Sequence, residues 1–164
     1  MKKITYLISI LFFLSLLSNC TGYQPIYGST DFNFKIAEYT IEGNKKIGNK
    51  LYAKLNNLSK SQKNLSDASQ IFLTINVQKN KKEMASDTAG QTIEYEITIN
   101  ATVNVKNYIT NNNILNQTFS SSALYRVQEQ YSDTIKAENK TIEELIQNLY
   151  QKILINLSEK ITQQ

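Results

Sequence analysis

The most constraining feature of this chain is a long run in which apolar and polar residues alternate between positions 93 and 105. Successive side chains of a β-strand point to opposite faces, so the run predicts a strand with one apolar and one polar face. A sheet built from such strands needs a second layer over its apolar face. The apolar face of this strand would carry Ile93, Tyr95, Ile97, Ile99, Ala101, Val103 and Val105.

Three shorter segments show the same alternation and predict three further strands. The first runs from Phe32 to Ile41 with one slip in its period, and Gly43 and Asn44 end it. Residues 79–91 would form the loop before the long strand, and Asn111–Asn113 the turn after it, because Asn tolerates a left-handed backbone. The other two segments would bury Ile71, Leu73, Ile75 and Val77, and Phe119, Ser121, Ala123, Tyr125 and Val127.

The C-terminal segment predicts a long amphipathic helix. Two starting points are open, because Ser132–Thr134 offer N-caps and Thr141 with Glu144 offers a later capping box. The apolar stripe of this helix would carry Ile142, Leu145, Ile146, Leu149, Tyr150, Ile153, Leu154, Leu157 and Ile161.

The order of the segments predicts the fold class. A short amphipathic helix lies between the first and second strands, since Ile47, Leu51, Leu55 and Leu58 follow one another at steps of four, four and three. A one-sided sheet and two amphipathic helices can cover one another's apolar faces. We therefore predict an α+β two-layer sandwich in the order β-α-β-β-β-α, with a four-stranded, mostly antiparallel sheet and two helices on one face.

The N-terminal segment has the composition of a secretory leader that ends at Cys20. Lys2 and Lys3 precede an apolar stretch that is too short to span a bilayer, which takes about 20 residues. Cys20 is the only cysteine, and a lone free thiol would be unusual in an exported protein. We expect residues 1–19 to be a signal peptide and Cys20 to be acylated. The alternative is an ordinary signal peptide that is cleaved nearby.

The composition excludes several classes of function. The chain has no histidine, and its one cysteine is assigned to the lipid, so Cys/His zinc sites and His-assisted nucleophiles are not available. Lys2 and Lys3 account for half of the formal net charge of +4, so the exported chain would be nearly neutral. We expect no metal, no cofactor apart from the covalent lipid on Cys20, and no binding to nucleic acid.

Paired carboxylates are the remaining candidates for catalysis. Glu94 and Glu96 would share the polar face of the long strand, and Glu143 and Glu144 lie close to Thr141. The sequence places no apolar surroundings next to Glu94 and Glu96 that would raise a pKa for acid catalysis. A solvated strand face and a helix cap explain these residues better, so we expect no catalytic residues and no enzymatic activity.

The segment that follows the leader resembles the start of a known protein family. The residues 20–28, Cys-Thr-Gly-Tyr-Gln-Pro-Ile-Tyr-Gly, are similar to the Cys-Gly-Phe-x-Pro-Leu-Tyr start of LptE, the lipopolysaccharide-assembly lipoprotein, in its alphaproteobacterial form. The likeness continues in the Asp87-Thr88-Ala89 loop and in the polar stretch 131–140 before the last apolar stripe. Asn19 departs from the usual lipobox, and Thr21 stands where the family has Gly.

The resemblance implies an outer-membrane lipoprotein whose Cys20 carries an N-acyl diacylglyceride. The residue after Cys20 is Thr21 and not aspartate. By likeness to bacterial lipoproteins, this implies sorting to the outer membrane. Residues 20–30 would be the lipidated tether and residues 31–164 an LptE-like α/β sandwich domain. Its partners would be an LptD-type β-barrel, which it plugs and helps to assemble, lipopolysaccharide, and the outer membrane. It would lie on the periplasmic side and within the barrel lumen.

Two alternatives for the function stay open at this point. The first is a periplasm-facing lipoprotein subunit of another envelope transporter or scaffold, with no barrel around it. The second, more distant, is a lipoprotein hydrolase that uses carboxylates.

Several residues are candidates for contacts with the implied ligand and partner. Lys79, Lys81 and Lys82 form the densest basic cluster, and Arg126 is the only arginine. Ammonium and guanidinium groups attract lipid phosphates, although a solvated loop and a cross-strand ion pair explain the same residues. Candidate contacts with the partner barrel are Tyr23, Pro25 and Tyr27.

Overall fold

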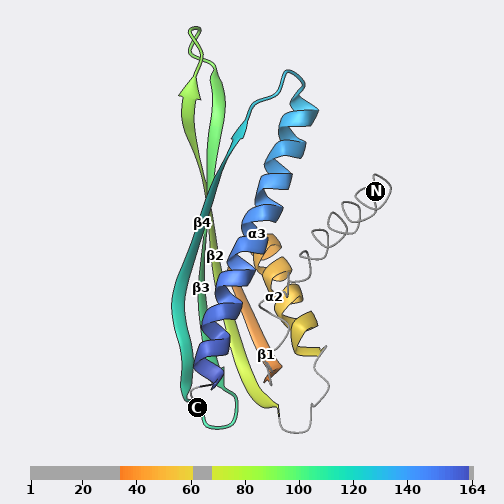
Figure 1. The fold of residues 1–164 in the computed structure, drawn as a ribbon, viewed down its shortest axis with the longest axis vertical. Coiled ribbons are helices and arrows are strands. Elements are labelled where there is room, and N and C mark those ends of the chain that lie inside the picture. Colours follow the sequence, from red (N-terminus) through yellow and green to blue (C-terminus); the bar gives the residue numbers. More distant parts are fainter. Residues whose placement is uncertain (1–33, 61–67, 163–164) are drawn as a thin grey trace, which may run out of the picture. The chain divides into compact units, whose positions relative to one another are not determined.

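The sheet and the two helices follow the predicted order β-α-β-β-β-α (Figure 1). The structure, a computed structural model, describes residues 34–60 and 68–162. The predictions for the leader, Cys20, the tether residues and Phe32 lie outside these ranges. The elements are β1 (Phe34–Gly43), α2 (Lys45–Lys60), β2 (Ser69–Ser86), β3 (Thr92–Asn107), β4 (Asn113–Arg126) and α3 (Tyr131–Thr162).

The four strands form one mixed sheet in the order β1-β2-β3-β4. The strand β1 pairs with β2 in parallel, while β2–β3 and β3–β4 are antiparallel. Antiparallel neighbours need only a turn between them, whereas the parallel pair needs a crossover, which α2 supplies. The predicted mostly antiparallel sheet is therefore confirmed.

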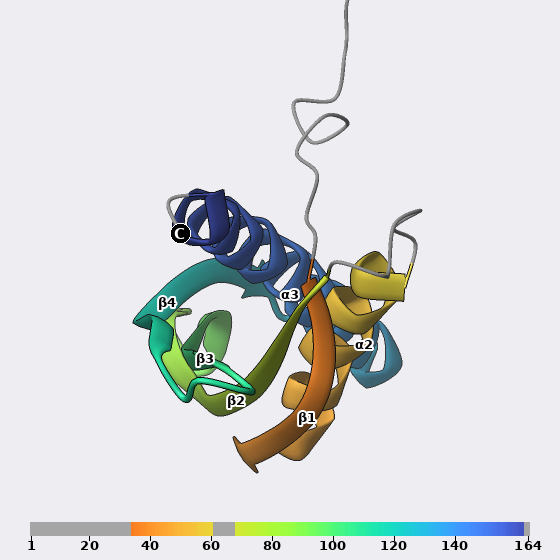
Figure 2. The same ribbon diagram turned by 90° about the horizontal axis from the view of Figure 1, so that it is seen from below.

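Both helices lie against the same face of the sheet (Figure 2). The helix α2 packs against β1 and β2, and α3 packs against β4 and β3. The apolar faces predicted for residues 71–77 and 97–105 are buried beneath them, each side chain being at most 2% exposed. Within the described residues, neither helix combines the length and the apolarity that a membrane span needs.

The slip in the alternation of the first strand corresponds to a β-bulge. The register of β1 against β2 shifts between Ile36 and Glu38, which leaves Ala37 unpaired. A bulge inserts one extra residue into a strand, so that the side chains beyond it change faces. The interrupted period in the sequence thus indicated this local irregularity correctly.

Two predicted boundaries are wrong, and the start of the last helix, which the sequence left open, is found close to the earlier of its two capping sites. Residues 79–86 continue β2 rather than forming a loop, and β4 begins at Asn113 rather than near Phe119. Beyond Val77 the alternation fades because the second half of β2 is exposed on both faces, and pairing with β3 alone keeps it extended. The helix α3 begins at Tyr131, so Thr141 lies inside it and caps nothing.

Gly43 allows the sharp change of direction from β1 into α2. Its φ is +69°, and a Cβ atom at this position would lie 2.2 Å from the backbone oxygen of Val77. That same oxygen accepts a hydrogen bond of 2.8 Å from the amide of Asn44. The side-chain oxygen of Asn44 in turn accepts from the amide of Ile47 at 3.2 Å, which caps the helix. The close approach therefore requires glycine.

We predict that Gly43→Ala destabilises the protein more than Gly90→Ala does. Gly90 also has a positive φ, +80°, but no atom lies within 4 Å of its added Cβ. Gly90→Ala should therefore cost only the left-handed backbone term, about 1–2 kcal/mol. Gly43→Ala adds a clash with backbone and should cost more. Urea unfolding of both variants measures the difference, and equal losses of stability would show that the close contact with Val77 is unimportant.

Candidate functional site

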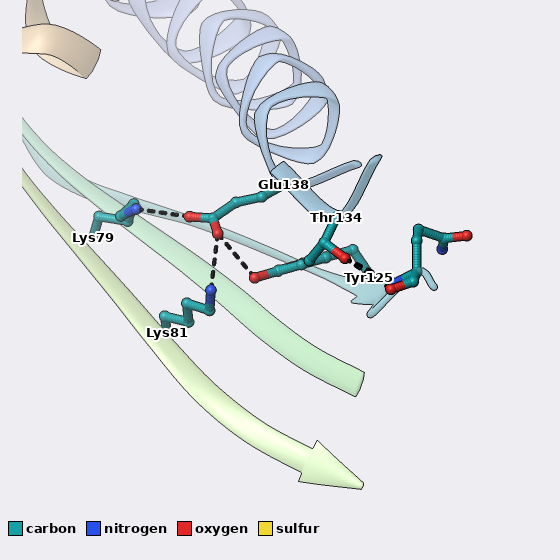
Figure 3. Close-up of polar contacts among 6 residues, drawn as sticks. Lys79, Lys81, Tyr125, Thr134 and Glu138 are labelled. Atoms are coloured by element: carbon teal, nitrogen blue, oxygen red, sulfur yellow. Dashed lines mark hydrogen bonds and ion pairs between the residues drawn. The ribbon is translucent and has the colours of Figure 1, made fainter. Parts of the chain in front are cut away.

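A cluster of charged and aromatic side chains lies where the first turns of α3 meet the sheet (Figure 3). The carboxylate of Glu138 accepts hydrogen bonds from the ammonium groups of Lys79, at 3.3 Å, and Lys81, at 2.8 Å. It also accepts one from the Tyr125 hydroxyl at 2.9 Å. We call these four residues, together with Tyr95, the Glu138 cluster.

The aromatic rings of the cluster form a platform for the Lys81 ammonium group. Tyr95 and Tyr125 stack with their ring centroids 5.7 Å apart. The Lys81 nitrogen lies 4.2 Å from the centroid of Tyr95 and 5.2 Å from that of Tyr125. A cation over an aromatic face is attracted by the ring quadrupole, so the platform adds to the ion pair with Glu138.

The two charges of the cluster stabilise each other. Burial alone would lower the pKa of Lys81, but hydrogen bonding and the charge of Glu138 outweigh it, so the pKa is raised. For Glu138, burial raises the pKa, but the hydrogen bonds from Lys81, Tyr125 and Lys79 together lower it by more than burial raises it. The net shift of the Glu138 pKa is therefore downward. Both side chains are therefore ionised at neutral pH, and the cluster binds α3 to β2 and β4.

A second polar contact connects the start of α3 to the end of β4. The hydroxyl of Thr134, a buried residue, accepts a hydrogen bond of 2.8 Å from the backbone amide of Gln128. The bond crosses the segment that links the two elements (Figure 3). It orders this link and fixes the start of α3, and Glu138 follows about two turns further along the helix, over the sheet.

The candidate phosphate contacts do not come together. Lys79 and Lys81 point toward α3 and are engaged by Glu138. Lys82 follows Lys81 on the strand and so points to the opposite face, next to its register partner Glu96. Arg126 forms a cross-strand ion pair with Glu94 at 3.6 Å, which is one of the two roles that the sequence allowed for it. The side chain of Arg126 is 82% exposed. Contact of these four residues with lipopolysaccharide stays a prediction.

Sequence reasoning missed Glu138, although a signal for it exists. Glu138 precedes Ile142, Leu145 and Leu149 at helical spacing, so it occupies the apolar stripe of α3. A carboxylate in such a stripe indicates a polar partner under the helix. The partner could not be identified, because β2 was expected to end before Lys79.

The face of the sheet opposite the helices is a regular polar surface. Across β2, β3 and β4 it presents amides and hydroxyls in register, and Thr102 and Thr118 hydrogen-bond across the strands at 2.8 Å. None of the central residues on these three strands carries a formal charge, and the carboxylate of Glu42, on the edge strand β1, accepts a hydrogen bond from Asn76 at 3.0 Å. We call it the uncovered face, and its central residues are Thr74, Asn76, Gln78, Thr98, Asn100, Thr102, Asn104, Asn116, Thr118, Ser120 and Ser122.

The carboxylate pairs are engaged in structural contacts. Glu143 forms an exposed ion pair with Lys50 of α2, and Glu144 lies 3.9 Å from Lys140 one turn earlier in α3. Among the described residues, no group of three His, Cys, Asp or Glu side chains could hold a metal ion. The Lys50–Glu143 pair thus connects α2 to α3, whereas the Lys140–Glu144 pair lies within α3 on its exposed surface.

This chain is similar to known proteins in its three-dimensional structure. No protein-family model and no curated protein matches the sequence. Among solved structures, rare lipoprotein B from Shewanella oneidensis aligns with a TM-score of 0.56 at 13% identity, over 77% of this chain and 97% of that one. This chain has an LptE-like fold. Family membership stays a prediction, because identity this low establishes the fold alone.

Two further lipoprotein structures share this fold. A minor lipoprotein from Acinetobacter baumannii aligns with a TM-score of 0.52 at 14% identity, over 77% of this chain and 93% of that one. The solution structure of lipoprotein B from Nitrosomonas europaea aligns with a TM-score of 0.53 at 14% identity, over 77% and 84% of the two chains. The LptE-like fold thus recurs in lipoproteins from several bacteria.

We predict that Glu138→Gln lowers the free energy of unfolding at pH 7 by about 1–3 kcal/mol, because it removes the charge that three donors share. The folded-state pKa of Glu138 lies below its ordinary value of 4.5. Its stabilisation is therefore complete above that pH and is lost as the pH falls through the folded-state pKa. The difference in the free energy of unfolding between the wild type and Glu138→Gln should therefore become smaller as the pH falls through this pKa. Denaturant titrations at a series of pH values measure it.

Glu143→Gln is the matched control for this experiment. Its ion pair with Lys50 is exposed, with side chains 40% and 52% accessible for Lys50 and Glu143, so the loss should stay within about 1 kcal/mol. A Glu138→Gln variant no less stable than this control would contradict the role assigned to the cluster.

Proposed function

We propose that this chain is an LptE-like outer-membrane lipoprotein that plugs and helps to assemble an LptD-type β-barrel for lipopolysaccharide transport. In this role it catalyses no reaction. The observation that carries the proposal is the LptE-like fold, in which the described helices leave one face of the sheet uncovered and this face is lined by neutral amides and hydroxyls.

The chemistry of the uncovered face suits the interior of a barrel. The lumen of an outer-membrane barrel is polar. Neutral amides and hydroxyls can exchange hydrogen bonds to water for bonds to such a wall, directly or through bridging water. Charged groups would pay a far larger desolvation cost. On β2, β3 and β4 the charges of this face lie toward its ends, for example at Lys106 at one end and at Glu94 and Arg126 at the other, and Glu42 of the edge strand β1 is hydrogen-bonded by Asn76 at 3.0 Å.

The anchor of the proposed plug is the acylated Cys20, which lies outside the described residues. The proteins that share the fold are named lipoproteins, which supports the same assignment for this chain. More than one acyl chain is needed for stable attachment, because a single chain binds a membrane only marginally.

We predict that the full-length chain co-purifies in a fixed ratio with a very large β-barrel protein. Asn100→Glu should reduce the recovered barrel about tenfold, because an unpaired charge in the interface costs at least about 1.4 kcal/mol. Affinity purification from solubilised outer membranes, with quantification of both chains, measures this ratio.

Asn100→Gln is the matched control, since it has the size of the Glu variant and keeps a neutral amide. It should recover the barrel as well as the wild-type chain does. If the chain is instead recovered alone, or with a soluble or inner-membrane protein, the plug proposal fails and the scaffold alternative is supported.

For the glycolipid, we predict that Lys82→Ala combined with Arg126→Ala weakens photocrosslinking to lipopolysaccharide without loss of stability. These two side chains lie on the side of the sheet away from α3 and hold no part of the Glu138 cluster. Lys79→Ala combined with Lys81→Ala should instead lower the free energy of unfolding, because it strips Glu138 of both cations. Unchanged crosslinking in the first variant would remove Lys82 and Arg126 from the candidate contacts.

A further inference from the structure

The turn between β3 and β4 exposes two large apolar side chains side by side. Ile109 is 78% exposed and Tyr108 is 50% exposed. Exposed apolar residues are ordinary when they are scattered, but an aromatic and an aliphatic residue together at the tip of a hairpin form a small protruding surface.

Hydrogen bonds hold this turn in one shape. The side-chain oxygen of Asn107 accepts from the amides of Ile109, at 3.0 Å, and Thr110, at 2.9 Å. The Asn107 backbone donates to the Asn112 oxygen and accepts from the Asn111 amide, and Asn111 has a φ of +59°. Since the turn is already ordered, inserting its tip into another phase would cost little conformational entropy.

The turn itself and the strand after it as far as Tyr125 carry no charge, and the nearest charged residue in the sequence is Lys106, at the end of β3. From Asn107 to Tyr125 the sequence contains no Asp, Glu, Lys or Arg. Charged groups resist transfer into a low-dielectric medium, so a turn without them can contact a lipid surface, while the long side chain of Lys106 can keep its ammonium group at the level of the headgroups.

The tip lies at the end of the sheet where the described chain begins. Phe34, the first residue of β1, pairs with Ser69, and the amide of Tyr108 donates to the oxygen of the next residue, Gln70, at 2.8 Å. In Figure 1 this is the lower end of the sheet, where the β3–β4 turn projects. The opposite tip, Asp87–Gly90, lies at the far end of β2 and β3.

Covalent geometry favours the Tyr108–Ile109 tip as the one that faces the anchor. The 14 residue steps from Cys20 to Phe34 span at most about 50 Å. The 18 residues of β2 rise by up to about 56 Å between Ser69, beside Phe34, and Ser86, next to the far tip. With the far tip on the membrane, the segment from Cys20 to Phe34 would have to be almost fully extended, whereas the Tyr108–Ile109 tip requires no such extension.

We infer that Tyr108 and Ile109 insert into the lipid leaflet that holds the acylated Cys20, an inference that rests on the lipid anchor of the proposed function. Tyrosine is enriched where the ring meets acyl chains and the hydroxyl meets headgroups, and isoleucine gains by leaving water. The tip and the anchor together form two attachment points at the same end of the sheet.

The test places an environment-sensitive fluorophore beside the tip of the full-length chain purified from outer membranes. Thr110→Cys supplies a unique reactive thiol, because acylation blocks Cys20 and the chain has no other cysteine. When the protein is bound to phosphatidylcholine vesicles that contain nitroxide-labelled lipid, the emission of the fluorophore at position 110 should shift to the blue. The nitroxide groups should also quench its intensity. A fluorophore at Ala89→Cys, on the opposite tip, should show neither effect.

A combined Tyr108→Ser and Ile109→Ser change in the Thr110→Cys chain should abolish the blue shift and the quenching. If it leaves both unchanged, or if the Thr110 and Ala89 fluorophores behave alike on vesicle-bound protein, the inference is overturned while the anchor stands. Palmitate labelling of the same preparation separates the two questions. A chain without the label would overturn the anchor and the inference together.

Discussion

The burial of one face of the sheet beneath two helices is the constraint on which the rest of this structure depends. Strands β2 and β3 place an uninterrupted apolar row under α2 and α3, and every residue of the row between 97 and 105 is fully buried. Because the helices cover only one face, the other face is free to carry amides and hydroxyls. The strands are also longer than the cover, so the hairpin of β2 and β3 continues past the core with both faces exposed.

The Glu138 cluster lies at the boundary between the covered and the exposed parts of the sheet. There the apolar contacts between helix and strands are replaced by an ion pair, a tyrosine hydroxyl and a cation above two rings. Such a group fixes the helix in direction as well as in distance, because its hydrogen bonds have preferred geometries. Two lysines that stand out as free cations in the sequence are therefore part of the packing of α3.

The sequence predicted the elements best where burial is one-sided. Residues 71–77 and 97–105 alternate cleanly, and the slip in the first strand marks a real bulge. Prediction failed where burial is absent or depends on a distant element. The second half of β2 shows no apolar period, because the side chains that it turns toward α3 are lysines and its end extends past the core. The two lysine partners of Glu138 are 57 and 59 residues away in the sequence.

The sequence by itself determined the order of the elements, the composition of the two sheet faces and the single cysteine near the N-terminus, because each is a local pattern of side chains. Only the tertiary structure decided that Lys79 and Lys81 face α3 while Lys82 faces away, since this depends on how far β2 extends. It also decided that Tyr108 and Ile109 lie at the same end of the sheet as Phe34. Strand pairing brings these residues together across about 75 positions of the chain, a distance that no local pattern spans.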